Sequence, residues 1–225
     1  MLRIHAVFDD DTDEYNTDIA SLINDTIEVS GSLPGKIWVG NHNLKLIDFL
    51  KSSYQVTADT EIFHYDSIEY RIDKKQFNNH CIRNLLSSRP YDEHYFDNYL
   101  MLLNDSMSFF IPPHDYMACK QKYMREFQEY KTKNTFEAFW KEDTLIGLYW
   151  LQGAEIDSIA VSPAFQRQGY GSVVLAHAIQ RVFDTNDTTH AKLYSVGWNS
   201  KAQFFYQSFG MEKYAQYRVQ YTSEN

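Results

Sequence analysis

The pattern of apolar and polar positions divides the chain into short elements that alternate between strand and helix. In residues 1–73, apolar side chains recur at every second position in some stretches and at helical spacing in others. A glycine follows the first helical stretch, where a helix is expected to end. The elements predicted here are strands at residues 2–8, 36–39 and 61–73, the last with a break near Asp66, and helices at residues 18–29 and 44–53.

The rest of the chain continues the alternation. The predicted helices are residues 94–104, 115–130, 172–183 and 200–208, and the predicted strands are residues 136–140, 145–151, 155–161, 192–196 and 213–221. Counted from the strand at residues 61–73, the order is strand, two helices, three strands, helix, strand, helix, strand. This order is typical of an α/β fold with one mixed central sheet flanked by helices. We therefore expect that fold class.

One segment of the chain is repeated without a gap. Residues 36–54 align with residues 192–210, with identities at five of nineteen positions, among them Asn43 with Asn199. Ordinary composition predicts about one identity in such an alignment. Two unrelated strand-helix units could share this similarity by chance. We favour the interpretation that residues 1–66 are a partial copy of the second half of the main fold.

Composition excludes several functional classes. The net charge is −9 and no basic stripe is present, so nucleic-acid binding is not expected. No apolar run reaches membrane-spanning length, no signal peptide is evident, and two cysteines make no disulfide framework. We expect a cytoplasmic protein without membrane contact. The histidines lack paired metal-ligand spacing, so no metal site is expected.

The sharpest motif is a glycine loop between a predicted strand and a predicted helix, with the sequence Gln166-Arg167-Gln168-Gly169-Tyr170-Gly171. Such a loop directs main-chain N–H groups into one concavity at a helix N-terminus, where anions bind. A Rossmann loop would need a third glycine and a position after the first strand. A Walker loop would need Gly-Lys-Ser/Thr, which is absent. A diphosphate-binding loop of another kind is indicated.

Together with a second motif, this loop resembles the cofactor-binding core of the GNAT acetyltransferases, the Gcn5-related N-acetyltransferases. The family pattern has Gln or Arg, two residues, Gly, one residue, and Gly or Ala. The second signature is matched by Asn199, Ala202, Tyr206 and Gly210. The resemblance implies a GNAT fold over residues 67–225 with a catalytic role. Residues 1–66 would be a degenerate half-domain without a cofactor loop.

The resemblance also implies a mechanism. Acetyl-CoA, as cosubstrate, would lie along Ile159, Ala160 and Val161, with its diphosphate on the loop Gln166–Ser172 and its pantetheine near Asn199. An amine would attack the thioester directly. A main-chain N–H near Ala160 or Val161 would stabilise the oxyanion.

The same resemblance suggests the two residues that transfer protons. Glu155 occupies the position of the general base in several family members, often acting through water, and Tyr206 that of the general acid. Asp157, two residues along the strand, is the alternative base, and water alone remains a third possibility.

The acceptor is not identified by the sequence. The family builds its acceptor pocket from the first two helices and their connection, which here corresponds to residues 104–116. Phe109, Phe110, His114 and Tyr116 could line it, or could belong to the core. We expect a small-molecule amine acceptor and a monomer or homodimer. The alternatives are a silent acyl-CoA-binding sensor, or an active enzyme whose residues 1–66 dock a partner.

Overall fold

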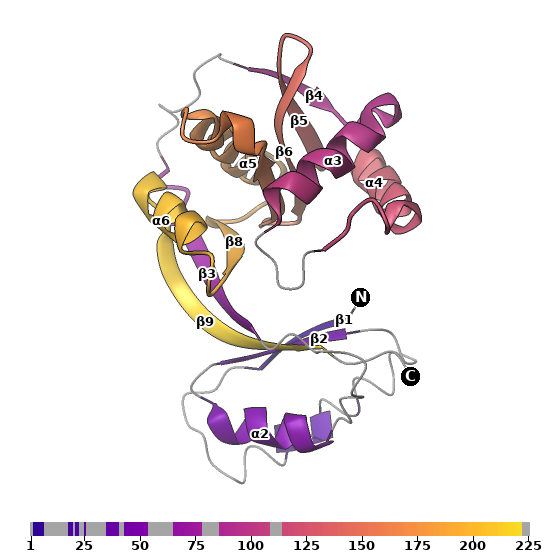
Figure 1. Cartoon of the computed structure of the whole chain (residues 1–225). Helices are drawn as coiled ribbons and strands as arrows, with labels where there is room; N and C mark the ends of the chain where they lie inside the picture. Colours follow the sequence, from indigo (N-terminus) through magenta and orange to yellow (C-terminus); the bar gives the residue numbers. More distant parts are fainter. Residues whose placement is uncertain are drawn as a thin grey trace. The chain divides into compact units, whose positions relative to one another are not determined.

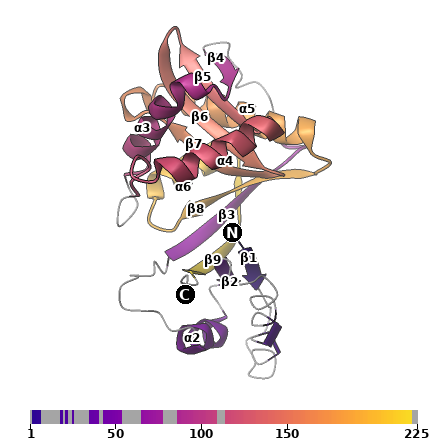
Figure 2. The same cartoon turned by 90° about the vertical axis from the view of Figure 1, so that its right-hand side faces the viewer.

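The computed structural model describes residues 2–6, 18–19, 21–22, 25, 35–40, 43–53, 65–77, 86–108 and 114–221. The chain divides into two compact units. The first comprises Met1–Tyr70, Ser195–Phe204 and Lys213–Asn225, and the second comprises Arg71–Tyr194 and Phe205–Glu212. Each unit is described by itself below, and Figures 1 and 2 show the elements of both.

The first unit contains a run of strands in the order β1-β2-β9-β3. Its elements are β1 (Leu2–Ala6), β2 (Gly35–Gly40), α2 (Leu44–Ser53), most of β3 (Tyr65–Asp73) and most of β9 (Glu212–Tyr221). Strands β1 and β2 are parallel, and β9 pairs antiparallel with β2. Helix α2 buries Leu46 and Ile47, as its amphipathic pattern predicts.

One sequence expectation for the first unit is wrong. Strand β3 runs without interruption through Asp66, whose carbonyl accepts a hydrogen bond of 2.6 Å from the Gly197 N–H. A cross-strand bond at this point keeps the strand extended, so the expected break does not occur. Leu22, an apolar residue within the predicted helix 18–29, is 64% exposed. All described residues of the predicted helix 18–29 are helical; residues 61–64 lie outside the described part.

The second unit contains a run of strands in the order β8-β7-β6-β5-β4. The strands are β4 (Ser87–Pro90), β5 (Phe136–Lys141), β6 (Thr144–Gln152), β7 (Glu155–Val161) and β8 (His190–Val196). The helices are α3 (Phe96–Ser106), α4 (Lys120–Lys133), α5 (Tyr170–Thr185) and α6 (Ser200–Phe209). The first half of α6, residues 200–204, belongs to the first unit. Short 3-10 turns, η2 (Glu93–Tyr95) and η3 (Pro163–Phe165), precede α3 and α5. This mixed α/β architecture confirms the predicted fold class.

Helices α3 and α4 cover one face of β5–β7, and α5 covers the other (Figures 1 and 2). An aromatic core lies under α3 and α4, where Phe127 contacts Phe136 and Trp150 with ring centroids 5.2 and 5.5 Å apart. On the opposite face, the Tyr149 hydroxyl lies 3.0 Å from His177 Nδ1 of α5. Alternation along β6 therefore sends Trp150 and Tyr149 to different layers.

Two features of the second unit differ from the sequence expectations. Helix α4 begins at Lys120 rather than Asp115, because the Asp115 carboxylate accepts a hydrogen bond from the Ala118 N–H and holds residues 115–118 in a separate turn. Strand β4 was not predicted at all. It is four residues long and mostly exposed, so its sequence carries little alternation; its pairing with β5 defines it.

Candidate active site

The glycine loop connects β7 to α5 in the predicted position. After η3, Arg167 and Gly169 adopt positive φ values of 60° and 86°, and α5 begins at Tyr170. The Gln166 side chain donates a hydrogen bond of 3.0 Å to the Val161 carbonyl, and Gln168 donates one of 3.1 Å to Ala164. The two glutamines thus fix the loop to the segment that precedes it.

The main-chain N–H groups at the start of α5 are available to a ligand. Among the hydrogen bonds of the described residues, none uses the N–H of Gly169, Tyr170 or Gly171 as donor. An ideal Cβ built on Gly169 meets no atom within 4 Å, so the space beside the loop is open. Free N–H groups at the positive end of a 16-residue helix suit a phosphate oxygen. The residues present therefore fit the diphosphate of a CoA molecule.

Strand β7, predicted to run beside the cofactor, contains a β-bulge at Asp157. Trp150 pairs with Ser158 and Leu151 pairs with Ile156, which leaves Asp157 as the extra residue. Bulges next to active sites redirect side chains and open the pairing locally. In a regular strand Glu155 and Asp157, two residues apart, would lie on the same face, and the bulge removes the basis for that expectation.

A glycine of β6 permits close approach at the C-terminal end of β7. Gly147 pairs with Val161, and an ideal Cβ on Gly147 would lie only 2.6 Å from the Ala160 carbonyl oxygen. Any larger residue would push the strands apart at Ile159–Val161, where the cofactor is expected. Sequence reasoning missed Gly147, although a lone glycine inside an apolar strand indicates such an approach.

Glu155 stands at the start of β7 beside a lysine. Lys192 is its partner in the parallel register with β8, and Lys192 Nζ lies 4.0 Å from the Glu155 carboxylate. The two side chains are 13% (Glu155) and 28% (Lys192) exposed, and Lys192 also approaches the Tyr194 hydroxyl at 3.5 Å. A cation at this distance favours the ionised form of a carboxylate. Lys192 was not singled out in the sequence.

Asp157 belongs to a different group, on the α3 and α4 side. The Trp150 indole donates a 2.7 Å hydrogen bond to its carboxylate. Burial, then the charges of Asp157 and Glu126, raise the pKa of Tyr116 to about 12. Burial also raises the pKa of the Glu126 carboxyl; the Lys122 ammonium opposes this shift and the Asp157 charge adds to it. The two carboxylates therefore share one electrostatic environment with a buried tyrosine.

The expected acceptor residues are partly brought together. His114 and Tyr116 lie with ring centroids 4.6 Å apart, and His114 Nε2 is 2.7 Å from the Tyr123 hydroxyl. The Tyr116 N–H is held by the Asn104 side chain at 2.7 Å, which joins the end of α3 to the turn before α4. Tyr116 is buried in the aromatic core. Phe109 and Phe110 lie outside the described residues.

The second motif is placed at α6. The Asn199 side chain accepts a hydrogen bond of 3.2 Å from the Ala202 N–H, so it caps the helix. Tyr206 is buried, 8% exposed, with its ring 5.5 Å from that of Phe205. Phe205 lies against the first turn of α5, 3.3 Å from an ideal Cβ on Gly171. The segment that carries Tyr206 therefore packs directly beside the glycine loop.

Within the described residues, no group of three or more potential ligands could hold a metal ion. None of the helices seen in these parts of the chain combines the length and apolar character that crossing a bilayer requires.

Solved structures share this fold at low sequence identity. A Drosophila protein has a TM-score of 0.62 and 14% identity over 86% of this chain and 62% of its own. A GNAT-family acetyltransferase from Colwellia psychrerythraea has a TM-score of 0.57 and 12% identity, over 91% and 72%. A tandem GNAT protein from the clavulanic acid biosynthesis pathway has a TM-score of 0.56 and 9% identity, over 92% and 69%. The chain thus spans less than two thirds of the Drosophila protein.

No curated protein matches the sequence. The acetyltransferase (GNAT) family model matches residues 99–211, half of the chain, and this range contains the glycine loop, β7 and Tyr206. Family match, fold and loop geometry agree, and the chain belongs to the GNAT acetyltransferase family.

Proposed function

We propose that the protein transfers an acetyl group from acetyl-CoA to an amine of a small molecule, by direct attack. The observation that carries the proposal is the row of unused N–H groups at Gly169, Tyr170 and Gly171, at the start of α5. Phosphate oxygens are among the anionic groups that such a row binds. Because the chain belongs to the GNAT acetyltransferase family, we infer that the phosphate oxygens are those of the diphosphate of a CoA thioester.

The cofactor would be held by two stretches of main chain in the second unit. The loop Gln166–Ser172 would hold the diphosphate, and the N–H and C=O groups of Ile159–Val161 would pair with the pantetheine. When bound, acetyl-CoA supplies an acyl group activated as a thioester.

Glu155 is the base of this proposal. An ammonium must lose a proton before it can attack, and the Glu155 carboxylate, with Lys192 Nζ 4.0 Å away, is the group proposed to accept it. Asp157 is the weaker candidate, because one of its oxygens already accepts the Trp150 indole hydrogen bond. Tyr206 would donate a proton to the departing thiolate, a role suited to a buried phenol beside the loop.

The acceptor is proposed to be a cationic amine. The electrostatic environment that Asp157 and Glu126 share with Tyr116 is negative. Carboxylates and aromatic rings attract an ammonium group. The net charge of −9 acts in the same direction over the whole chain.

Residues 1–66 are proposed to be a degenerate half-copy of the fold. In the repeat, α2 aligns with α6 residue for residue, and β2 aligns with all of β8 except its first residue. Strand β1 pairs parallel with β2, as β7 does with β8, and Arg3 stands opposite Lys36 where Glu155 stands opposite Lys192. A tandem GNAT protein among the fold relatives shows that this fold occurs in duplicate. We propose one acetyl-CoA bound per chain.

A screen of amines with acetyl-CoA tests the proposal, with released thiol as the readout. Polyamines, aminoglycosides, amino acids and peptide N-termini form the panel. Release that depends on one amine class supports the transferase. Tight acetyl-CoA binding without release for any class would instead support a silent acyl-CoA sensor.

A further inference from the structure

A lysine at the end of β5 lies beside the glycine loop. Lys141 Nζ donates a hydrogen bond of 3.3 Å to the hydroxyl of Tyr170, the loop residue at which α5 begins. The same ammonium lies 6.0 Å from the centre of the Tyr170 ring. Lys141 lies outside both sequence motifs, so the motifs do not account for a cation at this place.

The sheet determines where Lys141 lies. Lys141 is the last residue of β5 and pairs with Thr144 across the turn to β6. Two residues further along β6, the Ile146 carbonyl accepts a hydrogen bond of 2.9 Å from the Ser162 N–H, just where the chain leaves β7 toward the loop. The turn between β5 and β6 and the glycine loop therefore lie at the same end of the sheet.

Tyr170 holds the Lys141 ammonium in a defined position. The Tyr170 side chain is buried, and the ring of Phe165 from η3 packs edge-on against it, with ring centroids 6.3 Å apart. A hydroxyl on a buried, packed ring is an acceptor with little freedom to move. Lys141 itself is exposed, so a ligand from solvent can reach it.

The cations around the loop lack a carboxylate partner in the described part of the chain. None of the ion pairs there includes Lys141 or Arg167. Glu142 and Asp143 follow Lys141 directly, yet neither carboxylate lies within ion-pair distance of it. The first turn of α5 contains no acidic residue. Because a helix N-terminus carries partial positive charge, cations beside it are unfavourable unless an anion binds there.

We propose that Lys141 is a cofactor-binding residue, whose ammonium is positioned by the Tyr170 hydroxyl and contacts a phosphate group of acetyl-CoA. This inference rests on the proposed function, because it takes acetyl-CoA as the ligand of the loop. CoA carries a diphosphate and a separate phosphate on its ribose, and an ammonium can donate to either. Lys141 would add a full charge to the main-chain N–H groups of the loop and so favour phosphorylated thioesters over uncharged ones.

Calorimetry of the full chain with acetyl-CoA tests this role. Lys141→Met should weaken acetyl-CoA binding about tenfold, the loss of one hydrogen bond between charged groups. At about 1 M salt the Debye length falls to about 3 Å, so most of the difference from wild type should disappear. A change in packing alone would give a loss of affinity that salt does not remove.

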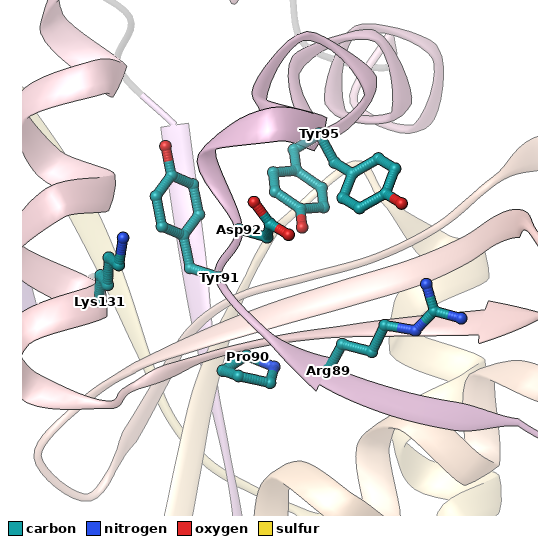
Figure 3. Close-up of a pocket in the computed structure, with 7 residues that line it drawn as sticks. Arg89, Pro90, Tyr91, Asp92, Tyr95 and Lys131 are labelled. Carbon is teal, nitrogen blue, oxygen red and sulfur yellow. The ribbon is translucent and has the colours of Figure 1, made fainter.

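Lys131→Met is the matched control. Lys131 is also exposed, and its Nζ also lies 6.0 Å from the centre of a tyrosine ring, that of Tyr91. Figure 3 shows both residues among those that line a pocket beside β4. Lys131 belongs to α4, which covers the face of β5–β7 opposite α5. Lys131→Met should therefore bind acetyl-CoA as the wild type does.

Two further measurements resolve the contact. Tyr170→Phe should weaken binding in the wild-type background but add little in Lys141→Met, because the hydroxyl acts through Lys141. Acetyl-dephospho-CoA, which lacks the ribose phosphate, identifies the group contacted. If Lys141→Met weakens the binding of both ligands equally, the contact is to the diphosphate. If it weakens only that of acetyl-CoA, the contact is to the ribose phosphate.

The outcomes separate this inference from the proposed function. If the wild type binds acetyl-CoA and folded Lys141→Met binds it as tightly, Lys141 has no such role and the proposed function stands. An equal loss in Lys131→Met, or a loss that high salt leaves unchanged, would also overturn the inference. Additive effects of Tyr170→Phe and Lys141→Met would overturn the positioning by Tyr170. If the wild type binds no acetyl-CoA, both proposals fall. Unfolding temperatures without ligand show whether each variant is folded.

Discussion

Lys192 Nζ lies 4.0 Å from the Glu155 carboxylate, and the two residues are register partners on adjacent parallel strands. Main-chain pairing places both side chains at the same level of the sheet, so their contact needs no flexible loop. In the aligned N-terminal segment the register partner of Lys36 is Arg3. The carboxylate that could accept a proton therefore occurs in only one of the two aligned strand pairs.

Replacing Lys192 should change the pH dependence of transfer. Lys192→Met removes the cation, which disfavours the ionised form of Glu155, so a higher pH is needed before the base can accept a proton. We expect the acid limb of the kcat/KM profile to move to higher pH, while Glu155→Gln should flatten it. Lys133→Met, at an exposed lysine paired with Glu129, is the control. If the acid limb of Lys192→Met lay at the same pH as that of the wild type, Lys192 would have no influence on the base.

Removing the Tyr206 hydroxyl should slow turnover without weakening acetyl-CoA binding. Only the departing thiolate loses its proton donor, and general acid catalysis contributes about 10²-fold or more. Steady-state kinetics of Tyr206→Phe, with acetyl-CoA affinity from calorimetry, checks this. Tyr130→Phe provides a second buried tyrosine of the second unit as comparison. Equal turnover in Tyr206→Phe and wild type would show that Tyr206 is an ordinary core residue.

Gly147→Ala should destabilise the second unit. The added Cβ would lie 2.6 Å from a main-chain oxygen of Ala160, and a strand can relieve that contact only by shifting. We expect a loss of about 1–3 kcal/mol in the free energy of unfolding, typical of an overpacked site. Denaturant unfolding of Gly147→Ala, compared with that of the wild type, measures it. A variant as stable as wild type would show that β6 and β7 separate easily.

Deleting residues 1–66 should give a poorly folded or aggregating fragment. The deletion removes β2, which pairs with residues 217–221 of β9, and leaves the β9 edge without its partner. Light scattering and thermal unfolding of the 67–225 fragment test this. A stable, fully active fragment would show residues 1–66 to be an independent appendage. Two molecules of acetyl-CoA per full-length chain would refute the half-copy interpretation.

The sequence predicted those helices and strands whose bounds follow from the pattern of their own apolar and polar residues. Helix α2 and strand β7 have the predicted bounds, because a clear periodicity is flanked by polar residues or glycine at each end.

The repeat also has a counterpart in hydrogen bonding. The N–H groups of Asn43 and Asn199 each donate to the residue three positions before, and their carbonyls accept from the residue four positions after.

Features that depend on distant partners could not be predicted. Strand β4 exists because β5 pairs with it, and the bulge at Asp157 is a mismatch between two strands rather than a property of either. Lys192 gains its role only from the register of β7 with β8. The start of α4 was missed for a different, local reason. The Asp115 carboxylate accepts a hydrogen bond from the Ala118 N–H, and the spacing of apolar residues does not indicate that bond.

Acetyl-CoA binding by Gly169→Val tests the central claim most directly. Gly169 has a φ of 86° and open space around it, and Gly153 shares both properties with a φ of 60°, so Gly153→Val reproduces the backbone strain away from the loop. By calorimetry we predict that wild type and Gly153→Val bind one acetyl-CoA per chain, whereas folded Gly169→Val binds none. Unchanged affinity in folded Gly169→Val would contradict the assignment of the loop Gln166–Ser172 as the diphosphate site.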